Sequence, residues 1–92
     1  MVDPGYGVEF RPEAQRDLAR LDRQVAQFVL DRVRWLAEHF DEITPEPLQG
    51  RTWRGVFKLR VSAYRVFYTV NHEQRILSLH RIGHRKDIYK VR

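Results

Sequence analysis

Residues 83–89, with the sequence Gly-His-Arg-Lys-Asp-Ile-Tyr, gather side chains that suit the cleavage of a phosphodiester. Arg85 can stabilise charge that builds up on phosphorus, and His84 can transfer a proton near neutral pH. Tyr89 can stack on a base or orient it, and Lys86 adds a cation that can bind phosphate. A basic tail that only contacts water would have a similar composition, so this segment alone leaves both interpretations open.

More cations lie in two neighbouring runs of alternating residues that are typical of β-strands. In the first run, Lys58 and Arg60 share one side and the apolar residues share the other, which predicts a core face and a cationic outer face. If the tyrosine and valine residues of the second run face the core, Arg65 and Phe67 join the same outer face. We therefore expect an exposed cationic surface with one exposed aromatic residue.

Other catalytic chemistries lack support in the sequence. The chain has no cysteine, and His72, His80 and His84 do not have the spacing of metal ligands. Only two acidic residues follow residue 50, so we expect no metal site and no cofactor. The serine and threonine residues have no histidine and acid placed to activate them. We expect His72 to lie in a turn and His80 to be a half-buried strand residue.

The two halves of the chain differ in charge. Residues 1–50 hold six arginines against ten acids, a net of −4, whereas residues 51–92 hold eight arginines and three lysines against two acids, a net of +9. This asymmetry indicates a polyanionic partner for the second half. Arginine outnumbers lysine fourteen to three, which favours bidentate phosphate binding, although GC-rich codon usage also raises the arginine content.

Hydrophobic spacing and turn residues predict one α+β domain over residues 1–92, with a β-α-α-β-β-β order. The expected elements are a strand at 6–10, helices that begin near Pro12 and after Asp22, a loop at 41–50, and strands near 54–61, 64–71 and 75–82. The helices should form an antiparallel hairpin on one face of a small, mostly antiparallel sheet, and the other face should be open. Gly83 should end the last strand, which should be central or covered.

No apolar run approaches the ~20 residues needed to cross a bilayer. The N-terminal residues also lack the basic and apolar regions of a secretion signal. We therefore expect a cytoplasmic protein with no membrane association.

Taken together, these segments resemble the RelE/ParE toxin superfamily, and its RelE-like branch in particular. The resemblance spans nearly the whole chain, and the order and spacing of its segments make it more specific than any one motif. It is carried by 83–89, Phe57-Lys58-Leu59-Arg60, Tyr64-Arg65-Val66-Phe67-Tyr68, Phe10 with Ala14, Asp17-Leu18 and Leu21, and Pro47-Leu48-Gln49-Gly50.

The resemblance implies the toxin of a type II toxin–antitoxin system, a metal-independent endoribonuclease that cleaves messenger RNA in the ribosomal A site. The RNA 2′-hydroxyl attacks its own phosphate. Lys58 and Arg60 match the family's paired basic residues, and Arg65 matches the arginine that contacts the scissile phosphate. Arg85 matches an arginine that donates a proton or stabilises charge, and Tyr89 matches a tyrosine that orients or deprotonates the nucleophile.

The resemblance also implies partners and an alternative function. An acidic, partly disordered, RelB-like antitoxin should cover the cationic face or displace the tail, and the toxin–antitoxin complex is expected to bind operator DNA. ParE-like members share the fold but inhibit DNA gyrase without enzymatic activity, and they generally lack the full Lys–Arg–Arg–Tyr set. Its presence here favours the ribonuclease. A nucleic-acid-binding module without catalysis is a third alternative.

Overall fold

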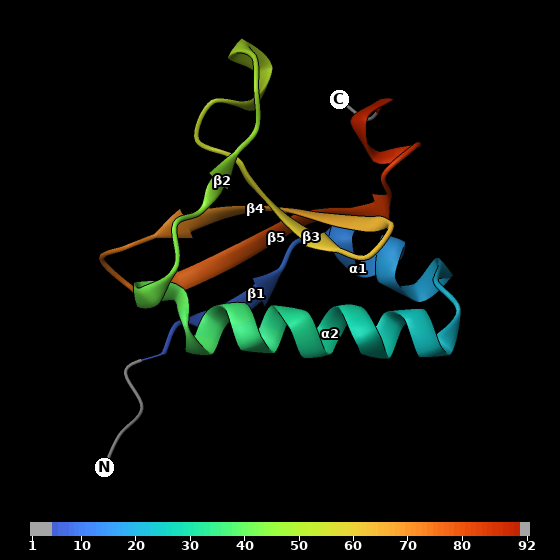
Figure 1. Ribbon diagram of the computed structural model, residues 1–92, viewed down its shortest axis with the longest axis horizontal. Helices are drawn as coiled ribbons and strands as arrows, with labels where there is room; N and C mark the ends of the chain where they lie inside the picture. Colours follow the sequence, from blue (N-terminus) through green and yellow to red (C-terminus); the bar gives the residue numbers. More distant parts are fainter. Residues whose placement is uncertain (1–4, 91–92) are drawn as a thin grey trace.

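The computed structural model describes residues 5–90, which form a five-stranded sheet with two helices packed against one face (Figure 1). The elements are β1 (Gly7–Phe10), α1 (Pro12–Arg20), α2 (Arg23–Glu38), β2 (Glu46–Pro47), β3 (Phe57–Val61), β4 (Tyr64–Asn71) and β5 (Ile76–His84), with short 3-10 helices at Phe40–Glu42, Arg51–Trp53 and Ile88–Lys90. The strand order is β1-β5-β4-β3-β2; β1 runs parallel to β5, and the other pairs are antiparallel. The predicted α+β class is confirmed.

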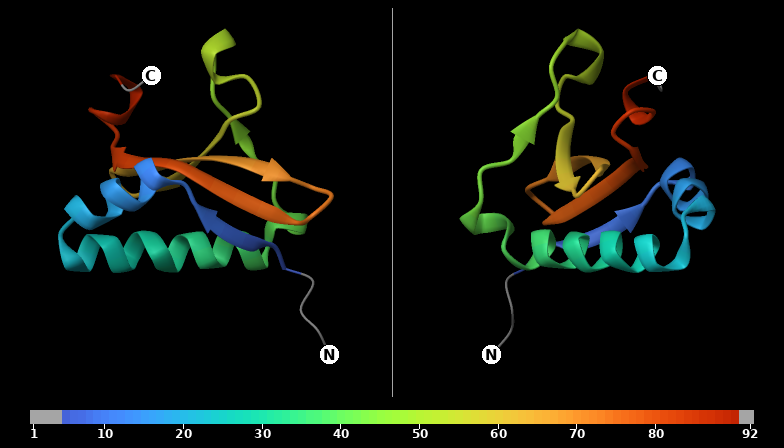
Figure 2. Two further views of the ribbon diagram at one scale, coloured as in Figure 1. Left: turned by 180° about the vertical axis from the view of Figure 1, so that it is seen from behind. Right: turned by 45° about the vertical axis from the view of Figure 1, so that its right-hand side comes forward.

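The helical hairpin begins where the sequence predicts. Pro12 occupies the first turn of α1, where its missing N–H costs nothing, and the Asp22 carboxylate accepts a hydrogen bond from the Gln24 N–H at the start of α2. The apolar stripe of α2 packs on the sheet and builds the main core with Leu59 and Val66 of the central strands. Figures 1 and 2 show α2 across one face, while the segment after β2 and the C-terminal segment rise from the other.

The loop predicted at 41–50 contains one strand that the sequence did not indicate. β2 is only two residues long and pairs with β3, so that Glu46 lies opposite Lys58 and Pro47 lies opposite Phe57. Pro45 and Pro47 favoured a loop, because proline cannot donate to a strand ladder. Here proline is tolerated because β2 is an edge strand of the sheet.

The outer face of the sheet is not open as predicted. Phe67 is only 1% exposed and packs with Leu48 and Ile88, which come from the segment after β2 and from the tail. The Trp53 ring covers it further, with ring centroids 5.2 Å apart. The prediction that Phe67 is exposed was therefore wrong. Two segments distant in sequence fold over its side chain and make a second, smaller core.

The last strand also differs from the prediction. β5 lies between β1 and β4, as expected for a central or covered strand, but it continues through Gly83 to His84. Its register with β4 shifts at Phe67/Tyr68, whose partners are Arg81 and Leu79, so His80 is the extra residue of a β-bulge. The bulge explains why Leu79 and Ile82 both lie in the main core although they are three residues apart.

Candidate phosphate-binding site

Lys58 and Tyr89 meet on the outer face of the sheet although they are 31 residues apart in sequence. Lys58 extends from β3, and its Nζ donates a hydrogen bond to the Tyr89 hydroxyl at 3.3 Å. The same Nζ lies 5.5 Å from the centroid of the Tyr89 ring, within the range of a cation–π interaction. Ile88 brings the tyrosine here, because its buried side chain anchors the tail over the second core.

Glu46 is a member of this surface that the sequence did not reveal. Arg60 donates to its carboxylate from both Nε and Nη2, at 2.8 and 2.6 Å, and Lys58 Nζ lies 3.5 Å from the same carboxylate. The Arg60 hydrogen bonds hold the pKa of Glu46 at about 2. No local signal marked this residue, because its place on the cationic face depends on the pairing of β2 with β3.

Arg65 is buried, contrary to the expectation that its side chain faces solvent. It is 7% exposed, and its Nη1 donates to the carbonyl oxygens of Ser62 and Tyr64 at 2.9 and 2.8 Å. Ser62 has a φ of 55° in the tight β3–β4 turn, whose carbonyls the guanidinium binds. Arg65 nevertheless lies directly opposite Arg60 on β3, so the two arginines are cross-strand neighbours.

The predicted tail residues border the same region. The Arg85 N–H donates to the Ala63 carbonyl at 2.7 Å, which fixes the tail to the β3–β4 turn, while the Arg85 and Lys86 side chains are exposed. The His84 ring packs edge-on against Tyr64, and its Nδ1 accepts a hydrogen bond from the Lys86 N–H at 3.1 Å. The neutral His84 that accepts this bond carries its proton on Nε2, and this N–H can donate a hydrogen bond to a substrate.

The other two histidines of the second half have the predicted positions. His72 follows the end of β4 in a turn, where its Nδ1 contacts the Tyr6 hydroxyl at 3.2 Å. His80 is half-buried, and its Nε2 lies 2.9 Å from the Thr69 hydroxyl. Burial and the nearby Arg11 lower the pKa of His80. Both residues therefore have structural contacts with neighbouring side chains.

Residues 5–90 contain no cluster of metal-ligand side chains and no helix that could span a membrane. Within this part of the chain, histidine and acidic residues form no group of three or more that could hold a metal ion. None of the helices described is long and apolar enough to cross a membrane.

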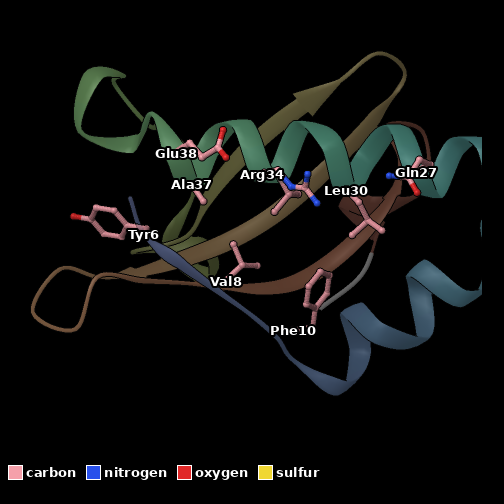
Figure 3. A pocket seen from close by; sticks show the side chains of 9 residues that line it. Tyr6, Val8, Phe10, Gln27, Leu30, Arg34, Ala37 and Glu38 are labelled. Atoms are coloured by element: carbon pink, nitrogen blue, oxygen red, sulfur yellow. The ribbon is translucent and has the colours of Figure 1, made fainter. Parts of the chain in front are cut away.

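A separate groove of about 540 Å³ lies between α2 and β1. Figure 3 shows Val8 and Phe10 of β1 and Leu30 and Ala37 of α2 around this groove, with Arg34 at its margin. Its lining is mostly apolar and includes none of the residues of the cationic surface. The molecule thus presents two chemically different surfaces, one apolar and concave and one charged, on different elements.

A helical hairpin under a five-stranded sheet, with cations and a tyrosine on the opposite face, defines the class of small toxin that the sequence resembles. The family model described as "ParE toxin of type II toxin-antitoxin system" matches residues 8–89. The chain is also 31% identical to Toxin RelG of Mycobacterium tuberculosis over 92% of its own length and 97% of that protein. It therefore belongs to the RelE/ParE toxin superfamily, and its relatives place it in the RelE-like branch.

Solved structures agree on the fold. A chain of the toxin–antitoxin complex RelBE2 from Mycobacterium tuberculosis is 26% identical, with a TM-score of 0.77 over 87% of this chain and 98% of that chain. The isolated Escherichia coli RelE toxin is 21% identical, with a TM-score of 0.71 over 92% of each chain. The chain is thus a toxin of a type II toxin–antitoxin system.

Proposed function

We propose that this toxin is a metal-independent endoribonuclease that cleaves messenger RNA in the ribosomal A site, in the cytoplasm. The observation that carries the proposal is the meeting of Lys58 and Tyr89 beside Arg60 on one face. Cations that are fixed before the substrate arrives stabilise charge in a transition state without reorganising. A phenol beside them can contact the ribose or base of the same nucleotide.

In the proposed reaction, the RNA 2′-oxygen forms a bond to the adjacent phosphorus while the bond to the 5′-oxygen breaks. The products are a 2′,3′-cyclic phosphate and a 5′-hydroxyl. Lys58 and Arg85 stabilise the phosphorane. Tyr89 accepts the proton of the 2′-hydroxyl as a phenolate, or it only orients that hydroxyl and the proton passes to water. Either His84 in its protonated form, through Nε2, or Arg85 delivers a proton to the departing oxygen. Such a charge contact is typically worth ~3–4 kcal/mol, and proton transfer adds ~10²–10⁴-fold.

Arg60, Arg65 and Lys86 have supporting roles in this proposal. Arg65 cannot approach a phosphate freely, because its Nη1 is held by the two turn carbonyls. It instead contributes a fixed positive charge beneath the surface, next to Arg60. Arg60 and the exposed Lys86 bind the flanking backbone of the RNA.

The experiment that tests this function is cleavage of messenger RNA on programmed ribosomes. The toxin is first stripped with a chelator, which is then removed because ribosomes need magnesium. Primer extension should show cuts in the A-site codon, and the upstream fragment should end in a cyclic phosphate. Tyr89→Phe and Lys58→Ala should lose activity, whereas Arg16→Ala, an exposed cation on α1, should not. Activity that returns only with zinc or manganese would contradict the metal-free chemistry.

Inhibition of DNA gyrase is a second candidate, because the matching family model is described for ParE toxins. A gyrase inhibitor would act through protein contacts, and the cationic residues would then not have to meet at a phosphate. The two functions differ in the cell: the ribonuclease stops translation, and the inhibitor stops DNA replication. Toxicity that arrests replication and survives Lys58→Ala and Tyr89→Phe would support the inhibitor.

We further propose that an acidic, partly disordered, RelB-like antitoxin neutralises the toxin and that the complex binds operator DNA. Similar chains have been solved in toxin–antitoxin complexes, including the archaeal RelE–RelB complex from Pyrococcus horikoshii. The net charge of +5 and the cationic surface suit an acidic partner. Association should slow markedly as salt rises, because steering between opposite charges is screened beyond ~10 Å at 0.1 M. A rate insensitive to salt would show that apolar docking, for example in the groove beside α2, determines binding.

A further inference from the structure

The guanidinium group of Arg60 already binds a carboxylate of the protein itself. Its Nε and Nη2, the pair of donors that would grip a phosphate bidentately, bind the two carboxylate oxygens of Glu46 at 2.8 and 2.6 Å. Lys58 approaches the same carboxylate at 3.5 Å and at the same time donates to Tyr89. The carboxylate of Glu46 thus lies between two of the proposed phosphate-binding cations.

The edge strand places this carboxylate and also leaves it accessible. Glu46 is opposite Lys58 in the β2–β3 register, so the backbone presents its side chain to the cationic surface. The side chains of Glu46 and Arg60 remain 41% and 56% exposed. Ion pairs at such exposed positions contribute little to stability, so a competing anion that makes several contacts can displace the carboxylate.

We propose that Glu46 is an internal counter-anion of the phosphate site, which occupies Arg60 in the free toxin and is displaced when an RNA phosphate binds. The identity of the anion rests on the proposed ribonuclease function, but the competition at Arg60 does not. The consequence is selectivity for RNA over an isolated phosphate. An isolated phosphate must compete with Glu46, whereas an RNA that also contacts Lys58 and the tail cations gains enough binding free energy to displace the carboxylate.

The charge state of Glu46 supports this role over proton transfer. Because Arg60 holds its pKa at about 2, Glu46 stays ionised throughout the neutral range, and protonation does not release Arg60 there. A carboxylate with so low a pKa is also a weak base while the pair is intact. Arg60 is therefore released when an RNA phosphate replaces the Glu46 carboxylate, and not when Glu46 is protonated.

The test compares RNA binding by the toxin and by Glu46→Gln, which keeps the side-chain shape and removes the charge. The probe is a fluorescein-labelled, single-stranded 2′-O-methyl RNA, which lacks the attacking hydroxyl and cannot be cleaved. Anisotropy titrations at several KCl concentrations give the Kd and its salt dependence. Glu46→Gln should bind roughly two- to fivefold more tightly at 0.1 M salt, the effect of one exposed ion pair. The plot of log Kd against log salt should steepen by up to about 0.7, because in the wild type the displaced Glu46 takes up a counterion that offsets the one released from the phosphate.

Asp41→Asn is the matched control, because it causes the same change in net charge at a distant ion pair, that of Asp41 with Arg75 at 2.8 Å. It should leave the Kd and the salt slope close to those of the wild type. Equal effects of Glu46→Gln and Asp41→Asn would overturn the proposal, since net charge alone would then explain them. Unchanged or weaker binding by Glu46→Gln would also overturn it. Melting curves of Glu46→Gln and of a second variant, Glu46→Ala, show whether a change in binding comes from misfolding.

Failure of this inference can be distinguished from failure of the proposed function. If the wild type cleaves messenger RNA on ribosomes and Glu46→Gln binds RNA as the wild type does, the counter-anion role of Glu46 is refuted and the ribonuclease function stands. If Glu46→Gln binds RNA more tightly but the wild-type toxin cuts no RNA, the counter-anion role stands and the ribonuclease function is refuted. Glu46→Gln that binds like the wild type but loses cleavage would assign Glu46 to the chemistry and refute the competition.

Discussion

Arg65→Ala should destabilise the toxin as well as inactivate it, because the side chain is part of the β3–β4 turn. The substitution removes two hydrogen bonds from a charged donor to the carbonyls of Ser62 and Tyr64. Hydrogen bonds to charged groups contribute ~1.5–3 kcal/mol each. The Ser62 residue is exposed, so water can replace part of the lost interaction, and we expect a total cost of about 2–3 kcal/mol.

The assay is thermal unfolding followed by circular dichroism. For a domain of this size, 1 kcal/mol shifts Tm by roughly 4–8 °C, so Arg65→Ala should melt about 10–20 °C below the wild type. Arg60→Ala is the matched control on the same face, because Arg60 is the cross-strand neighbour of Arg65 but is exposed. Its substitution should change stability by about 0.5 kcal/mol or less.

Cleavage must then be measured at a temperature where each variant is folded. If Arg65 also supplies charge to the reaction, Arg65→Ala should lose ~10²-fold in rate beyond the unfolded fraction. Arg65→Lys should recover part of that rate but less of the stability, since an ammonium does not reproduce the guanidinium geometry. A Tm within about 3 °C of the wild type would refute the structural role of Arg65 in the turn. A rate loss fully explained by unfolding would refute the electrostatic one.

Substitutions at three further positions test other parts of the structure. Arg85→Ala should reduce cleavage on ribosomes by ~10²-fold with little change in Tm, and Arg85→Lys should restore part of it if charge alone matters; full activity of the alanine variant would contradict its role. Asp17→Ala should cost about 3 kcal/mol in denaturant unfolding, since Asp17 is 7% exposed, pairs with Arg81 at 2.8 Å and accepts the Ile82 N–H at 2.9 Å. Burial raises the pKa of Asp17, but those hydrogen bonds lower it below 3.8, so its contribution is present above about pH 4 and should be lost as pH falls further; an equal acid sensitivity in Asp17→Asn would contradict this. Ile88→Ala should reduce cleavage about as much as Tyr89→Phe, because it releases the tail from the second core, and increased Trp53 exposure should report the release by fluorescence.

The parts of the fold that depend on residues close together in the sequence were predictable from the sequence. Helix spacing together with Pro12 and Asp22 located the helical hairpin, and alternation assigned the two sides of β3. The bulge at His80 was not predictable, because β5 is apolar in both registers and only its pairing with β4 selects one. The burial of Phe67 depends on segments that meet it only in three dimensions, so local alternation placed it wrongly in solvent.

The candidate site shows the same division between local pattern and long-range contact. Alternation placed Lys58 and Arg60 on one face, and the resemblance to the toxin superfamily added Arg85 and Tyr89. Neither could place Glu46, whose position follows from the two-residue pairing of β2 with β3.

The second core explains how so small a sheet can hold both a buried and a charged outer surface. Phe67 and Ile88 exclude water from one part of the outer face, and the residue that follows Ile88 is Tyr89, which reaches Lys58. Burial of Ile88 therefore stabilises the tail in the position where the tyrosine and the lysine meet. A partner that displaced the tail would remove Tyr89 from Lys58 without having to cover Lys58. Inhibition by displacement and inhibition by covering the cations are thus physically distinct, and only the first would increase the exposure of Phe67.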